Sequence, residues 1–177
     1  MYLVSIYFDE KTNKRIQQYI NDIARITGNT YMLDGNVPPH ITVASFETDR
    51  EAEAVAMLEA VAKELGSGKI RWVSVGTFLP YVMYLAPVLN QYLHALSSGI
   101  NEKLNTMDGV KISRFYQPFQ WMPHTTIGKK LSGEELRQAF EVMQNQFGPF
   151  EGNVMQIGLA KTNPYRDVAV IELNDMP

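Results

Sequence analysis

Along the chain, stretches in which apolar residues recur at every second position are followed by stretches in which they recur every three or four positions. Apolar residues at every second position, or in short β-branched clusters, are typical of strands, whereas spacings of three and four are typical of amphipathic helices. Strand-like stretches occur at 1–8, 40–46, 69–78, 82–86, 124–127, 154–161 and 168–173. Helical spacing occurs between several of them, so the sequence predicts an α+β fold.

Four helices are predicted from their apolar stripes and their end signals. They run from Glu10 to Gly28, from a capping box at 48–51 to Gly66, from Pro87 to about Leu104, and from a capping box at 132–135 to about Phe147. A capping box is a Ser or Thr followed three residues later by Glu, which together satisfy free N–H groups at a helix start. Pro87 suits a first helical turn, where its missing N–H is not needed. The polar segment 29–39 is predicted to be a loop.

The order of the predicted elements repeats. Residues up to about 80 read strand, helix, loop, strand, helix, strand, and the rest of the chain repeats that order with different residues. No change of composition marks a linker between the halves. We therefore expect a single bilobal domain over 1–177, with lobe-forming repeats of approximately 1–80 and 81–177. The closing strands are expected to be joined by a turn at "TNPYRD", residues 162–167.

The two repeats match best at "PHITV", residues 39–43, and "PHTTI", residues 123–127. Two of the three histidines in the chain therefore occupy equivalent places. Residues i and i+2 of a strand project from the same face, so in each motif the histidine and the threonine two positions later point the same way. These side chains are His40 with Thr42, and His124 with Thr126. If a pseudo-twofold axis relates the halves, all four face each other across one cleft.

Such a pocket suits metal-free chemistry on a phosphodiester. Two imidazoles with an unperturbed pKa of ~6.5 allow one neutral and one protonated ring near neutral pH. One can take a proton from a nucleophile while the other gives a proton to a leaving oxygen. Threonine hydroxyls can donate hydrogen bonds to the non-bridging oxygens of a phosphate. A single His-x-Thr in a strand is usually structural, so the prediction depends on the duplication.

Composition and charge restrict the other function classes. With 45% hydrophobic and 20% charged residues in 177, the chain is typical of a globular domain. A net charge of −3 argues against a general basic field for nucleic acid, so a nucleotide contact must be local. The lack of cysteine excludes disulfides and thiol nucleophiles, and no third ligand stands at metal-binding spacing beside the histidines. We expect no metal and no cofactor.

The same features bear on location and assembly. The apolar start of the chain has no basic segment before it, which argues against a signal peptide. No apolar run reaches the ~20 residues that span a bilayer. The expectation is a soluble, cytoplasmic monomer without a membrane partner.

Two H-x-T motifs, each opening a strand in one half of a duplicated α+β chain, resemble the 2H phosphoesterase superfamily, and most closely its 2′-5′ RNA ligase-like and cyclic phosphodiesterase proteins. "VGTFLPYVMYLAP", residues 75–87, also resembles the family's segment between the lobes. The resemblance implies a bilobal fold of two antiparallel sheets around a central cleft, with helices outside. It implies metal-independent hydrolysis of 2′,3′-cyclic phosphates of nucleotides or RNA ends, or of 2′-5′ linked nucleotides. His40 and His124 would be catalytic, and Thr42 and Thr126 would bind phosphate.

Four further residues are candidates for substrate binding. They are Lys129, Tyr7, Tyr84 and Trp121. Many members of that family carry arginine five residues after the second histidine, and Lys129 supplies the charge there without the bidentate fork of arginine. Strict alternation would place Lys130 on the His124 face, so we expect a bulge or a strand end before Lys129. The aromatic residues before the second motif suit base stacking and loop packing equally.

Other readings of the same residues stay open. A non-catalytic module that binds nucleotides or RNA ends would share the fold, although two intact H-x-T motifs favour an enzyme. Metal-dependent hydrolysis is a further alternative, and ligase action in the reverse direction would use the same side chains. The motifs do not distinguish the general base from the general acid.

Overall fold

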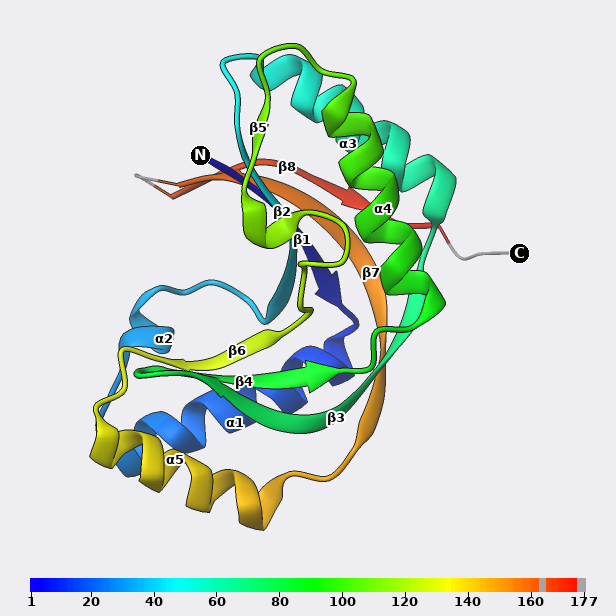
Figure 1. The fold of residues 1–177 in the computed structure, drawn as a ribbon. Helices are drawn as coiled ribbons and strands as arrows, with labels where there is room; N and C mark the ends of the chain where they lie inside the picture. The colour runs from blue at the N-terminus through cyan, green and yellow to red at the C-terminus, as the bar shows by residue number, and fades with distance from the viewer. Residues whose placement is uncertain (163–164, 175–177) are drawn as a thin grey trace.

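In the computed structural model, which describes residues 1–162 and 165–174, these residues form eight strands, five helices and a short 3-10 turn. The strands are β1 (Tyr2–Phe8), β2 (His40–Glu47), β3 (Gly68–Phe78), β4 (Val82–Pro87), β5 (Lys111–Ile112), β6 (Thr125–Lys129), β7 (Phe150–Lys161) and β8 (Arg166–Glu172). The helices are α1 (Glu10–Thr27), α2 (Tyr31–Asp34), α3 (Glu51–Leu65), α4 (Gln91–Asn105) and α5 (Gly133–Gln146), with a 3-10 turn, η1 (Arg114–Tyr116). All strand pairs are antiparallel and the main helices lie outside the sheet (Figure 1), so the predicted α+β class is confirmed.

Strand β7 joins the two parts of the sheet. The strand order is β5-β2-β1-β7-β3-β4-β6, and β8 pairs with β7 beside this path. Residues 154–161 of β7 pair with β1, whereas residues 150–154 pair with β3. The two sheets that the resemblance implied are therefore hydrogen-bonded into one sheet, which curves along β7 (Figure 1). The curvature brings β2 next to β6, which are far apart in the strand order.

The four longer helices cover the convex side of the sheet in two pairs. Helix α1 packs against α5, and α3 packs against α4 (Figure 1). Each pair takes one helix from either half of the sequence, so the halves interleave in space. A boundary near residue 80 marks the repeat along the sequence, but it does not separate the two sides of the sheet.

The predicted capping box at 48–51 is wrong. Helix α3 begins at Glu51 with Arg50 in the capping position, and no side chain caps it. The Thr48 hydroxyl instead accepts a hydrogen bond from the backbone N–H of Arg50 at 3.0 Å, which makes a turn before the helix. The second capping box, between Ser132 and Glu135 at the start of α5, is confirmed.

The predicted helix start at Pro87 is also wrong. Pro87 is the last residue of β4 and lies opposite Trp72 of β3. Helix α4 begins later, where the Asn90 side chain accepts from the N–H of Leu93. The loop at 29–39 contains the one-turn helix α2. Residues 163 and 164 of the predicted "TNPYRD" turn lie outside the described residues.

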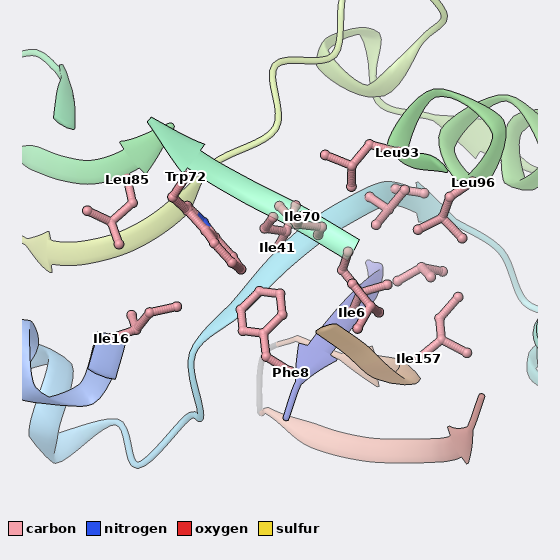
Figure 2. Packing of buried hydrophobic residues seen from close by; sticks show 14 of the residues in the cluster. Ile6, Phe8, Ile16, Ile41, Ile70, Trp72, Leu85, Leu93, Leu96 and Ile157 are labelled. Carbon is pink, nitrogen blue, oxygen red and sulfur yellow. The ribbon is translucent and has the colours of Figure 1, made fainter. Parts of the chain in front are cut away.

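The core is continuous between the sheet and the helices (Figure 2). Trp72 is fully buried at its centre. Its indole stacks on Phe150 with ring centroids 4.9 Å apart and meets the edge of Phe8 at 5.0 Å. The indole N–H donates to the Thr125 hydroxyl at 3.1 Å, which satisfies both buried polar groups. This contact holds Thr125 inward, so its neighbours His124 and Thr126 project to the concave side.

Candidate active site

His40 and His124 are held in the same way. Nδ1 of His40 lies 2.8 Å from the carbonyl oxygen of Pro38, and Nδ1 of His124 lies 2.9 Å from that of Met122. A carbonyl oxygen only accepts, so each Nδ1 carries the proton. The other nitrogen, Nε2, is then left for a substrate or a water molecule. A neutral Nε2 can accept a proton, and a protonated one can donate it.

Strand alternation sets the direction of both motifs. The residues between histidine and threonine, Ile41 and Thr125, are fully buried on the core side. The four motif side chains on the other face are partly exposed. They are His40, Thr42, His124 and Thr126. Each motif therefore turns its chemical groups away from the core.

A β-bulge follows the threonine in both motifs. Val43 of β2 has no directly opposite residue on β1, and Ile127 of β6 has none on β4. The two residues after each threonine are consequently both buried, because a bulge interrupts the alternation of faces. Alternation resumes with Lys129, which lines a cavity beside His40. The expected interruption before Lys129 is confirmed.

A tyrosine lies beside each histidine. Tyr7 of β1 is opposite His40, with ring centroids 6.2 Å apart. Tyr84 of β4 is opposite Thr126, and its ring lies 5.6 Å from that of His124. The two neighbouring strands thus place equivalent aromatic rings on the concave face.

Each of these tyrosines covers a glycine of the adjoining strand. A Cβ atom on Gly158 of β7 would lie 2.8 Å from Cε2 of Tyr7, and one on Gly76 of β3 would lie 2.6 Å from Cζ of Tyr84. Both distances are too short for a carbon–carbon contact. Glycine therefore permits each ring to lie directly on the backbone of the next strand.

Phe78 at the end of β3 is a further aromatic residue of the site. Its ring meets the edge of His124 at 4.8 Å and lies 4.4 Å from Tyr84. It is 39% exposed, so part of the ring is accessible. The sequence pattern did not indicate this residue, although Phe78 and Gly76 alternate onto one face of β3.

A cavity of about 530 Å³ lies on the concave face next to His40. Four predicted site residues line it: Tyr7, His40, Thr126 and Lys129. The first two come from β1 and β2 and the others from β6, so the fold brings both halves of the repeat to one cavity. The segment around α2 also lines it, through residues such as Tyr31 and Asp34.

The other predicted residues lie around this cavity rather than in its lining. The Thr42 hydroxyl is 3.3 Å from Oγ of Ser5, which does line the cavity. Trp121 donates its indole N–H to the Thr42 carbonyl at 3.0 Å and packs against the core. Trp121 therefore ties the segment before the second motif to the first motif. His124 and Tyr84 lie together beside Phe78.

Burial lowers the pKa of both histidines. The carbonyl of Pro38 acts in the opposite direction on His40, and the positive charges of His124 and Lys129 lower the pKa of His40 further. For His124 burial is opposed only by the carbonyl of Met122. Of the two imidazoles, His40 is the one whose protonation Lys129 also disfavours.

The hydroxyl of Tyr7 lies near two further polar groups, Tyr165 and Asp167. Burial raises the pKa of the Tyr7 hydroxyl, and Tyr165 acts in the opposite direction. Tyr165 donates to the carboxylate of Asp167 at 2.8 Å.

Two other features are absent from residues 1–162 and 165–174: a cluster of metal-binding side chains and a membrane-spanning helix. No three His, Cys, Asp or Glu side chains gather there in a group that could hold a metal ion. In the same described segments, no helix has the length and apolar character needed to cross a membrane.

Comparisons with known proteins give a consistent result. The family model described as the 2′-5′ RNA ligase superfamily matches residues 13–166. A relative from Geobacillus kaustophilus (strain HTA426), named "Putative phosphoesterase GK0864", is 30% identical over 146 residues, which cover 80% of this chain and 78% of the relative.

Solved structures share the fold. The protein TT0787 of Thermus thermophilus matches with a TM-score of 0.60 and 13% identity over 97% of both chains. E. coli LigT complexed with 3′-AMP matches with a TM-score of 0.59 and 12% identity over 98% of both chains. The sequence matches confirm the resemblance to the 2H phosphoesterase superfamily and support a phosphoesterase, and hence hydrolase, activity in general.

Proposed function

The chain belongs to the 2′-5′ RNA ligase superfamily, and on that premise we propose that it is a metal-independent phosphodiesterase with two catalytic histidines. Its substrates are 2′,3′-cyclic phosphates of nucleotides or RNA ends, or the related 2′-5′ linked nucleotides. One observation carries the proposal: both imidazoles donate from Nδ1 to the carbonyl of the residue two positions earlier. Each ring is thereby fixed with Nε2 available to the substrate.

His40 is the general base and His124 the general acid in this proposal. The charge of Lys129 disfavours protonation of His40 and is not among the causes that act on His124, so in the proposal His40 is the ring that stays neutral while His124 holds a proton. Nε2 of His40 accepts a proton from water as the water oxygen bonds to phosphorus. Nε2–H of His124 donates its proton to the ribose oxygen as the phosphorus–oxygen bond breaks. Exchange with solvent then restores both rings.

The threonines and Lys129 act on the phosphate oxygens. Hydroxyls of Thr42 and Thr126 donate hydrogen bonds to non-bridging oxygens, whose negative charge grows in the transition state. The ammonium of Lys129 stabilises the same charge without the paired geometry of arginine. Tyr7, Tyr84 and Phe78 surround the reacting group with aromatic surface, and Tyr7 and Tyr84 orient the imidazoles beside them.

A small nucleotide or the 3′ end of an RNA is the proposed partner. E. coli LigT, which has the same fold, was solved with 3′-AMP. A nucleoside 3′-phosphate is also one product of opening a 2′,3′-cyclic phosphate. This chemical relation supports a nucleotide ligand in the cavity beside His40.

The test is a product-resolved assay of the purified protein with EDTA present. Substrates are the four 2′,3′-cyclic nucleotides and a set of 2′-5′ dinucleotides, with products separated by chromatography. We expect conversion of the cyclic nucleotides to 2′- or 3′-nucleotides at a rate that EDTA does not change. Tight binding without product would favour the non-catalytic module, and loss of turnover with EDTA would favour a metal-dependent hydrolase.

A further inference from the structure

Two consecutive lysines at the end of β6 share one aromatic ring. Nζ of Lys130 lies 4.5 Å from the ring centroid of Tyr31, and Nζ of Lys129 lies 5.8 Å from it. These distances are typical of cation–π interactions. Tyr31 and Lys129 both line the cavity beside His40. The pair of ammonium groups therefore lies at the edge of the proposed active site.

The backbone at Lys130 is held in an unusual conformation. Its φ is +56°, in the left-handed region that residues other than glycine rarely adopt. The side-chain amide of Asn29 donates to the carbonyl of Lys130 at 3.1 Å and so ties this turn to the segment that precedes α2. Such conformations persist where the surroundings hold them, and they are concentrated at ligand-binding and active sites.

Neither lysine is neutralised by a carboxylate. Among the residues that the structure describes, Lys129 and Lys130 take part in no ion pair. Asp34, a carboxylate in the lining of the same cavity, accepts a hydrogen bond from the Thr30 hydroxyl at 2.8 Å. Two unpaired cations near one ring repel each other, and an anion between them would remove that repulsion. The protein has a net charge of −3, so this is a local positive site on an acidic molecule.

We propose that Lys130, supported by Tyr31, binds a second phosphate group of the substrate beside the scissile one. The proposal rests on the proposed function and narrows its substrate class to cyclic phosphates that carry another phosphate. Tyr31 is 39% exposed, so its face can hold the ammonium while the three N–H donors of the lysine still reach a phosphate. The second phosphate belongs either to the 5′ position of the same nucleoside or to the preceding linkage of an RNA 3′ end.

The kinetic test compares three substrates with one base. They are adenosine 2′,3′-cyclic phosphate, the same compound with a 5′-phosphate, and a diadenylate ending in a 2′,3′-cyclic phosphate. The variant is Lys130→Asn, because asparagine tolerates a left-handed φ better than most residues. We expect a tenfold loss of kcat/KM, as an order of magnitude, on whichever substrate supplies the second phosphate, and a change below about twofold on the simple cyclic nucleotide.

The matched control is Lys161→Gln. Nζ of Lys161 lies 5.4 Å from the ring centroid of Tyr2, so it is a second lysine–tyrosine pair, and neither residue lines the cavity. This variant should leave all three substrates unchanged. Equal losses on all three substrates with Lys130→Asn, or no preference of the native protein for a second phosphate, would overturn the inference while leaving the proposed function intact.

A binding measurement separates the two proposals if no substrate is turned over. Calorimetric titration would compare adenosine 3′,5′-bisphosphate with 3′-AMP on the native protein and on Lys130→Asn. Tighter binding of the bisphosphate that disappears in the variant supports the second phosphate site independently of catalysis. Equal affinities in both proteins contradict it. Absence of turnover would count only against the proposed phosphodiesterase.

Discussion

His40 and His124 have the same backbone partner, the same following bulge and an equivalent tyrosine over glycine, yet their surroundings differ. His40 borders the cavity with Lys129, and Tyr7 beside it is 7% exposed. His124 meets Phe78 and the more exposed Tyr84. The duplicated features orient two rings alike, whereas the unshared ones bring the rings into different electrostatic environments. In the proposed mechanism, that difference makes one ring a base and the other an acid.

The two motifs differ in charge at the position five residues after the histidine. That position is Lys129 in the second motif and Ser45, which is buried, in the first. At this position, therefore, only the second motif carries a cation. A symmetric pair of lysines would lower the pKa of both imidazoles and remove the distinction between them.

The largest expected effect is loss of either histidine. Replacing His40 or His124 with alanine should lower kcat by ~10²–10⁴, because each removes one half of the proton transfer. The double variant should lose far less than the product of the single losses, because groups that act together are not additive. The control is His94→Ala, which changes the third histidine of the chain, on α4. Turnover of the double variant within a few-fold of the native protein would exclude both roles.

Loss of a threonine hydroxyl should lower kcat less than loss of a histidine, and the loss should differ between the two motifs. Thr126→Val removes a hydroxyl that has no hydrogen-bond partner in the described part of the chain, and we expect kcat to fall by about 10². Thr42→Val should cost less, since Ser5 places a second hydroxyl 3.3 Å from the one removed. Steady-state kinetics of the two variants, with Ser5→Ala alone and combined with Thr42→Val, measures the difference. A larger loss at Thr42 than at Thr126 would show that Ser5 does not compensate.

The paired motif could be predicted from the sequence because its signal is local. His40 and Thr42 lie two residues apart in one strand, so alternation alone gives their shared face. The repeat of "PH-x-T" supplied the second pair, and the position of Lys129 off the strict alternation indicated a bulge or a strand end before it. The α+β class followed from periodicity for the same reason.

Other features depend on contacts between segments distant in sequence. Phe78 reaches His124 because β3, β4 and β6 are neighbours, and no spacing within β3 reveals that order. The pairing of α1 with α5 likewise depends on how the sheet curves, so the lobes do not follow the sequence halves. Pro87 shows the limit of a local rule. Proline suits the first turn of a helix, but it also suits the end of a strand, and tertiary pairing with Trp72 decided between them.

Replacing the glycines beneath Tyr7 and Tyr84 with alanine should lower the free energy of unfolding by different amounts, because the two rings are buried to different extents. Gly158→Ala would press a Cβ against the buried Tyr7 and should reduce the free energy of unfolding by about 1–3 kcal/mol. Gly76→Ala should cost less, because the half-buried Tyr84 has room to move toward solvent. Urea denaturation measures both. Gly133→Ala is the control, since a Cβ there meets no atom within 4 Å. Equal costs at Gly158 and Gly76 would mean that the difference in burial has no energetic consequence.

The smallest expected change is in the shape of the pH profile, and it tests the assignment of base and acid directly. In the free enzyme the rising limb of kcat/KM follows deprotonation of His40, and the falling limb follows deprotonation of His124. Burial lowers the pKa of both rings, so both limbs shift toward acid and the maximum should lie below the ordinary histidine pKa of ~6.5. The residual activity of His40→Ala should lose the rising limb, and that of His124→Ala should lose the falling limb. The opposite pattern would exchange the two roles, because the ring that limits activity at low pH is the one that must be neutral to accept a proton.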